Sequence, residues 1–237
     1  MSQLPGGELK TRPLHFIWIC DCSGTMSVNG KIEALNNAIK ESIPEMQRVA
    51  NENVNAQVLV RAVKFSNSAQ WHIATPTPVD SFRWEDLSAD GLTDMGRALS
   101  LVAEQLKMPP MTDRALPPVL VLISDGQPTD DFRSGVKALM EQPWGKKAVR
   151  IAIAIGGDAE LDPLQEFIGN PEMKPLQANN AETLVKYIRW ASTAVLKSAS
   201  APSSQPSGSS TSKVGTVPIP AAPAASTTSS TDDDPWW

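Results

Sequence analysis

The chain has 237 residues, of which 41% are hydrophobic, and its formal net charge is -5. This composition suits one folded domain with an appendage. The acidic balance and the lack of any block of basic residues argue against a nucleic-acid partner, because phosphate binding needs a basic face. No segment has the length and hydropathy of a membrane span, and the polar residues 1–12 contain no apolar signal core. We therefore expect a short N-terminal extension over 1–12 and a cytoplasmic protein with no membrane contact.

The stretch from Leu14 to Cys20 is apolar, β-branched and aromatic, which predicts a strand buried on both faces. Directly after it come a carboxylate at Asp21 and hydroxyls at Ser23 and Thr25, and Gly24 allows the tight turn between them. In an open parallel sheet, ligand sites lie where strands end at their carboxyl side. The order of residues therefore places these three side chains in such a crevice. Cys22 lies too close to Cys20 for a disulfide to constrain anything, so we expect two reduced thiols.

The rest of the chain alternates strands with helices. The spacing of apolar residues predicts a helix from about Lys31 to Val49, which Pro44 bends or restarts. A strand over 54–65 and a short one over 69–74 form a hairpin, and the prolines of 75–78 end it. The remaining predicted elements are a helix over 95–106, strands over 119–123 and 149–155, helices through 132–140 and 161–168, a small strand near 174–178 and a helix over 182–199.

Strands that alternate with helices imply right-handed crossovers and a mainly parallel sheet covered on both faces. We therefore expect a doubly wound, three-layer α/β domain over residues 13–198 with one antiparallel edge strand. Residues 199–237 are rich in Ser, Thr, Pro and Ala, which predicts a disordered tail. Its acidic and tryptophan-containing stretch, Asp232 to Trp237, is either the end of a solvating linker or a docking peptide.

Oxygen-bearing side chains lie in three separate loops, which should meet at one edge of the sheet. They are Asp21, Ser23 and Thr25 in the first loop, Thr93 in the second and Asp125 in the third. Two carboxylates and three hydroxyls suit a hard divalent cation such as Mg²⁺, Mn²⁺ or Ca²⁺, and no set of His and Cys suits zinc. Such a site cannot fully neutralise the ion, so an Asp or Glu of a protein partner could complete its coordination. We interpret Asp94 as the cap of the helix that follows it, with a role as a further ligand as the alternative. We interpret Asp130 and Asp131 as caps of the next helix, with a partner contact as the alternative.

The order Asp21-Cys22-Ser23-Gly24-Thr25, then Thr93, then Asp125-Gly126 resembles the metal-ion-dependent adhesion site (MIDAS) of von Willebrand factor A domains. The resemblance covers roughly residues 13–197. It implies that Asp21, Ser23, Thr25, Thr93 and Asp125 bind the metal and that the domain binds proteins rather than catalysing a reaction. Two positions depart from the pattern, since Thr25 stands where the family usually has Ser and Leu92 where a second Gly is common.

A narrower resemblance links the chain to the bacterial tellurite-resistance TerY-like proteins. It rests on Ile32-Glu33-Ala34-Leu35-Asn36, on Asp125 to Asp131 and on Trp190-Ala191-Ser192. This resemblance implies a cytoplasmic role in metal or chemical stress responses, with a protein kinase and a PP2C-type protein phosphatase as partners.

The alternative function is a Mg²⁺-dependent phosphatase in which Asp21 is the nucleophile. That chemistry commonly needs a second carboxylate two residues later, where this chain has Ser23. A lysine that would neutralise the transferred phosphate is also not evident near the other loops. The sequence therefore favours a binding module over a phosphatase.

Overall fold

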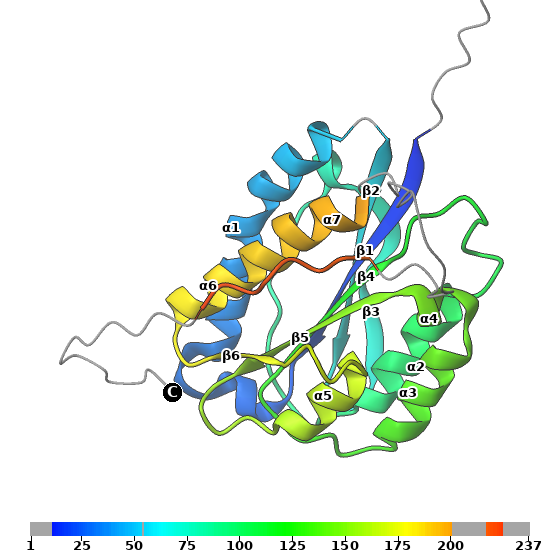
Figure 1. The fold of residues 1–237 in the computed structure, drawn as a ribbon. Helices are drawn as coiled ribbons and strands as arrows, with labels where there is room; N and C mark the ends of the chain where they lie inside the picture. The colour runs from blue at the N-terminus through cyan, green and yellow to red at the C-terminus, as the bar shows by residue number, and fades with distance from the viewer. Residues whose placement is uncertain (1–10, 54, 201–216, 225–237) are drawn as a thin grey trace, which may run out of the picture.

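The computed structural model describes residues 11–53, 55–200 and 217–224. They form a six-stranded sheet with helices on both faces (Figure 1). The strands are β1 (Arg12–Asp21), β2 (Ala56–Phe65), β3 (Ala69–Pro78), β4 (Val119–Ser124), β5 (Val149–Ile155) and β6 (Leu176–Ala178). The helices are α1 (Lys31–Asn51), α2 (Met95–Gln105), α3 (Phe132–Glu141), α4 (Pro143–Lys147), α5 (Leu161–Ile168), α6 (Ala181–Trp190) and α7 (Leu196–Ser200).

The strand order is β3-β2-β1-β4-β5-β6, and all neighbours are parallel except β2 and β3. The predicted fold class, a mainly parallel sheet with one antiparallel edge strand, is thus confirmed. Because the chain winds outward from β1 in both directions, β1 and β4 lie side by side at the centre. The carboxyl ends of these two strands, Asp21 and Ser124, begin the crevice at the switch point.

Each face of the sheet buries its own hydrophobic core. Alternate β1 residues point to opposite sides, so Phe16 and Trp18 pack with α1, α6 and α7, whereas Ile17 and Ile19 pack with α2, α3, α4 and α5. Figure 1 shows α1, α6 and α7 together on one side of the sheet. This burial on both faces explains why the central strands are continuously apolar instead of alternating.

The prolines after residue 74 do not end the second hairpin strand, contrary to the sequence prediction. β3 continues to Pro78 and pairs with β2 on both sides of an irregular stretch, with Ile73 opposite Ala62 and Thr77 opposite Val60. Pro76 lies in that irregular stretch, and β3 is the edge of the sheet. Edge strands and bulges are the positions where a sheet tolerates a residue without an N–H.

Two helices also differ from the predicted pattern. α1 runs unbroken through Pro44, which is exposed, and the carbonyl left without a donor belongs to the exposed Lys40. The predicted last helix contains a π-helical turn at Ala191–Val195 between α6 and α7. The short helix α4, which packs the buried Trp144, was not predicted. Among the described residues, no helix combines the length and hydropathy needed to cross a bilayer.

Most of the predicted N-terminal extension and tail lies outside the described residues, including the stretch from Asp232 to Trp237. The described residues 217–224 are an exception within the predicted tail. They lie along α6 and α7 (Figure 1), and Val217 and Ile219 pack against the core on that side. The composition of the tail gave no sign of this contact.

Candidate functional site

Asp21 ends β1 with a fully buried carboxylate whose two oxygens are both held by hydrogen bonds. The Ser23 N–H donates to Oδ1 at 2.8 Å, and the Ser124 hydroxyl at the end of β4 donates to Oδ2. Burial raises the pKa of Asp21 from its ordinary value of 3.8 to about 6, and these hydrogen bonds oppose the shift. The carboxylate is therefore fixed in orientation at the junction of the two central strands.

The hydroxyls of the first loop join Asp21 to the third loop. Ser23 Oγ lies 3.0 Å from Thr25 Oγ1, and the Thr25 hydroxyl donates to Asp125 Oδ1 at 2.8 Å. Ser23 and Asp125 are only 2% and 6% exposed, whereas Thr25 is exposed. The cluster thus opens to solvent on the side of Thr25.

Backbone hydrogen bonds bring the second loop against the first. The N–H of Gly24 donates to the carbonyl of Gly91 at 2.9 Å, and the N–H of Asp90 donates to the carbonyl of Cys22 at 2.8 Å. Gly91 has a φ of 88°, a conformation that favours glycine. These contacts lead the chain directly into the buried Thr93, which begins the approach to α2.

Gly126 locates the Thr93 hydroxyl relative to the other two loops. A Cβ atom placed on Gly126 would lie 3.5 Å from Thr93 Oγ1 and 3.8 Å from Thr25 Oγ1. The absent side chain therefore leaves a small cradle bounded by hydroxyls of the first and second loops. The structure brings all five predicted residues, Asp21, Ser23, Thr25, Thr93 and Asp125, to this one edge of the sheet.

Lys31 is a site residue that the sequence pattern did not reveal. Its Nζ lies 2.7 Å from Asp125 Oδ2, and the lysine is 4% exposed. The same ammonium is 3.9 Å from Asp158 Oδ1, in the loop after β5. The expectation that no lysine lies near these loops was wrong. One signal was available, because a lysine at the first position of a helix opposes the helix dipole and needs another reason to be there.

The predicted capping roles also need a correction. Asp94 precedes α2 but makes no capping hydrogen bond, and its carboxylate lies 3.4 Å from the Arg97 guanidinium. Asp130 caps α2 from the third loop instead, since its carboxylate accepts the N–H groups of Gly96 and Arg97 at 2.9 and 2.8 Å. Asp131 caps its own helix α3 as predicted, by accepting the N–H of Ser134.

The two cysteines and His72 lie outside the hydroxyl cluster and have roles in packing and hydrogen bonding. Cys20 and Cys22 are buried and unbridged, and burial raises the pKa of Cys22 to about 12, so its thiol stays protonated. His72 lies 2.8 Å from the carbonyl of Glu85 through its Nε2. Neither cysteine nor His72 contacts the hydroxyl cluster through a hydrogen bond that the described residues show.

The donors of the cluster fit a hard divalent cation better than zinc. The described residues contain no group of three or more His, Cys, Asp or Glu side chains arranged to hold a metal. Instead, two carboxylates and three hydroxyls lie together at this edge of the sheet, which is a donor set of oxygen atoms only. The chemistry of these donors therefore fits Mg²⁺, Mn²⁺ or Ca²⁺.

Comparisons with solved structures show the same fold in several proteins. The von Willebrand factor type A protein from Catenulispora acidiphila is 17% identical over 79% of this chain, with a TM-score of 0.57. The ArnB paralog VWA2 from Sulfolobus acidocaldarius is 18% identical over 76%, with a TM-score of 0.55. Proximal thread matrix protein 1 from the mussel byssus, described with a zinc-occupied MIDAS motif, is 16% identical over 80%, with a TM-score of 0.58.

The chain spans 43%, 45% and 47% of these three proteins, so it corresponds to under half of each. A comparison with curated protein sequences gave no match. The sequence model of the von Willebrand factor type A domain matches residues 17–189, which include all three loops and Lys31. The chain therefore belongs to the von Willebrand factor type A domain family.

Proposed function

We propose that this domain binds a divalent cation through Asp21, Ser23, Thr25, Thr93 and Asp125 and thereby recruits a protein partner. The observation that carries the proposal is the cradle beside Gly126, where hydroxyls from two loops face space that a side chain would fill. A cation held there would supply a Lewis-acidic position that an Asp or Glu of the partner completes. Mg²⁺ is the cation we favour, with Mn²⁺ and Ca²⁺ compatible with the same oxygen donors.

The charges in the site support recruitment of an acidic partner. Asp21 and Asp125 are the two carboxylates of the cluster, and Lys31 already neutralises part of their charge at Asp125. A divalent cation would then leave the site with net positive charge, which a carboxylate from outside would compensate. Thr25, on the exposed side, would be the first site residue that a partner meets.

We further propose a cytoplasmic role in a bacterial tellurite-resistance or stress-signalling system, with a protein kinase and a PP2C-type phosphatase as partners. What supports this setting is the resemblance at Ile32 to Asn36, Asp125 to Asp131 and Trp190 to Ser192. The family match supports the coarser role of a binding domain.

The alternative function, a phosphatase with Asp21 as nucleophile, gains one supporting observation and meets one objection. Lys31 supplies the cation that such chemistry needs, but it faces Asp125 rather than Asp21. Asp21 is fully buried and both its oxygens accept hydrogen bonds, so it does not face a substrate. Phosphoester hydrolysis with Mg²⁺ that is lost in Asp21→Asn would favour this alternative over the binding module.

The metal site is tested by removing one hydroxyl without changing the shape of its side chain. Thr93→Val should weaken binding of Mn²⁺, followed by titration calorimetry, by at least about tenfold, because one of few donors is lost. Thr75→Val, at an exposed threonine of β3, is the matched control and should bind Mn²⁺ like the native chain. Equal affinities for all three proteins would contradict the proposed site.

The partner role is tested by capture from source cells. The native chain should capture an associated protein in Mg²⁺ and lose it when EDTA is added. Asp21→Ala should capture none under either condition. If the partner is still captured in EDTA, or by the Asp21 variant, protein binding does not require the metal and this part of the proposal is overturned.

A further inference from the structure

Residues 217–224, which we call the C-terminal strap, lie along the helices on the α1 face of the sheet (Figure 1, red-orange segment). The hydroxyl of Ser198 in α7 donates to the carbonyl of Pro218, and Lys186 Nζ in α6 donates to the carbonyl of Ala224 at 2.6 Å. The strap therefore runs antiparallel to the helices. Residues 217–224 form neither helix nor strand, and they run along α6 and α7 (Figure 1).

Its sequence is suited to an extended docking segment. Val217 and Ile219 pack against the core, whereas Pro218 between them is exposed. Proline fixes φ near the extended value, so Pro218 and Pro220 reduce the conformational entropy that ordering this segment would cost. The alternation gives two apolar anchors on one side of a pre-organised backbone.

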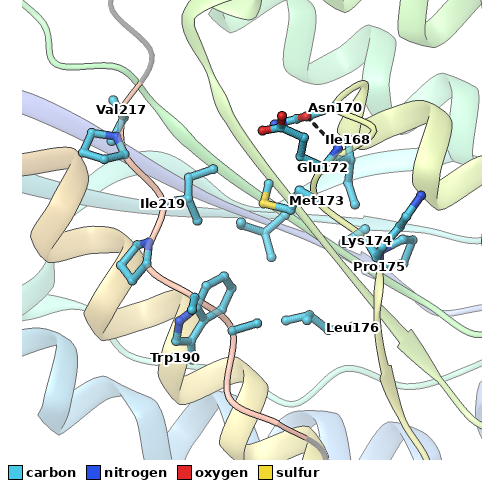
Figure 2. A pocket seen from close by; sticks show the side chains of 16 residues that line it. Ile168, Asn170, Glu172, Met173, Lys174, Pro175, Leu176, Trp190, Val217 and Ile219 are labelled. Carbon is cyan, nitrogen blue, oxygen red and sulfur yellow. Dashed lines mark hydrogen bonds between the residues drawn. The ribbon is translucent and has the colours of Figure 1, made fainter.

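The strap covers an apolar groove that it does not fill. A cavity of about 520 Å³ remains between Val217 and Ile219 of the strap and Met173, Leu176 and Trp190 of the domain. Figure 2 shows Ile219 and Met173 reaching toward each other across it. The buried Nε1–H of Trp190 also has no acceptor among the residues that the structure describes. Unfilled volume and an unpaired donor both weaken the fit, because native interiors are close-packed and satisfy their polar groups.

We propose that this groove, between α6 and the loop before β6, is a docking site for an extended apolar segment with alternating prolines. Its occupant in this chain is the C-terminal strap, bound in cis and exchangeable. Residues 201–216 join α7 covalently to the strap, and a covalent connection raises the concentration of a segment at its own binding site. A weakly fitting segment therefore suffices to occupy the groove in cis, and the same segment supplied from outside competes poorly with it.

The exchange is tested on the full chain with the anchors removed. In Val217→Asp/Ile219→Asp, two charges replace the apolar anchors and should release the strap. A fluorescent peptide with the native sequence of residues 214–226 should then bind this variant at least ten times more tightly than it binds the native chain, as measured by anisotropy. Asn37→Asp/Gln70→Asp adds the same two charges at exposed residues that do not line the groove, and this variant should bind the peptide as weakly as the native chain does.

Two further measurements keep the test decisive. Circular dichroism establishes that each variant is folded, and Ile219→Ala, a milder change, replaces the double variant if the latter does not fold. A folded release variant that binds the peptide no better than the native chain overturns the proposal. So does a native dimer that the release variant loses, because the strap would then occupy the groove of a second copy. None of these measurements involves the metal, so their outcome is independent of the proposed function.

Discussion

Gly126 is the residue at which fold and metal binding can be separated most cleanly. Its φ lies outside the left-handed region, and an added Cβ would meet Thr93 Oγ1 and Thr25 Oγ1 only at ordinary contact distances of 3.5 and 3.8 Å. Gly126→Ala should therefore change the free energy of unfolding by less than about 1 kcal/mol, while its methyl group occupies the cradle. We expect Mn²⁺ affinity to fall at least tenfold in calorimetry. Unchanged affinity in the variant would place the cation elsewhere.

His15 gives the domain a pH dependence with a definite sign. Burial, helped by Arg61, lowers its pKa from the ordinary value of 6.5 to about 4. Between pH 6.5 and 4 the unfolded chain therefore binds a proton that the folded chain refuses, and stability falls as the pH falls through this window. In urea unfolding at pH 7 and pH 4.5, the native chain should lose about 1 to 2 kcal/mol more than His15→Gln, a value below the full shift because the ring is partly exposed. Parallel losses would contradict this account.

The positions of Asp21 and Asp125 were predictable from the sequence because each follows a strong local signal. Asp21 comes directly after an apolar strand, and Asp125 after another, so the rule for strand ends in parallel sheets places them together. Lys31 was missed because its partner Asp125 is 94 residues away in the sequence, and no local pattern links the two. Long-range pairs of this kind follow from the packing of elements rather than from periodicity.

At the scale of elements, the same distinction separates correct from incorrect predictions. The central strands were predicted closely because burial on both faces leaves a continuous apolar run. The predicted β3 was too short because we assumed that proline ends a strand, as it does in the middle of a sheet. β3 lies at the edge, where proline is tolerated, and its edge position depends on the arrangement of the whole sheet. The π-helical turn and the packing of the strap also depend on neighbours that no local pattern identifies.

The cap that Asp130 supplies to α2 connects the second and third loops of the site. Thr93 and Thr129 strengthen the link, since the Thr93 N–H donates to the Thr129 hydroxyl and the Thr129 N–H donates to the Thr93 carbonyl, both at 3.0 Å. Asp130→Ala should cost about 1 to 2 kcal/mol in urea unfolding, as the loss of a helix cap does. It should also weaken Mn²⁺ binding, because Thr93 lies at the start of the helix that loses its cap.

Asp131→Ala is the matched control, since Asp131 caps only α3. It should cost a similar free energy of unfolding without weakening Mn²⁺ binding. If both variants lower the Mn²⁺ affinity equally, a general loss of stability rather than the link between the loops would explain the weaker binding.

At the scale of the whole molecule, a cation bound at the proposed site would be coupled to stability through the charge balance of Lys31 and Asp125. Lys31 and Asp125 form a buried pair, and removing one partner of such a pair leaves an uncompensated charge that costs about 3 to 5 kcal/mol. Lys31→Met should therefore lower the melting temperature of the chain in EDTA. A bound cation supplies the missing positive charge, so Mg²⁺ should raise the melting temperature of this variant more than that of the native chain. Thermal unfolding with and without Mg²⁺ measures both effects.

The comparison that isolates this coupling is Lys40→Met, which removes an exposed ammonium paired with Asp86 at 2.5 Å. A solvent-exposed pair contributes little, so this variant should melt like the native chain in EDTA and in Mg²⁺. A cation at 100 times its dissociation constant stabilises a folded protein by about 2.7 kcal/mol, enough to restore most of what Lys31→Met loses. Mg²⁺ should reduce the difference in melting temperature between the native chain and Lys31→Met. If it does not, the cation does not share Asp125 with Lys31, and the five donors do not act as one site.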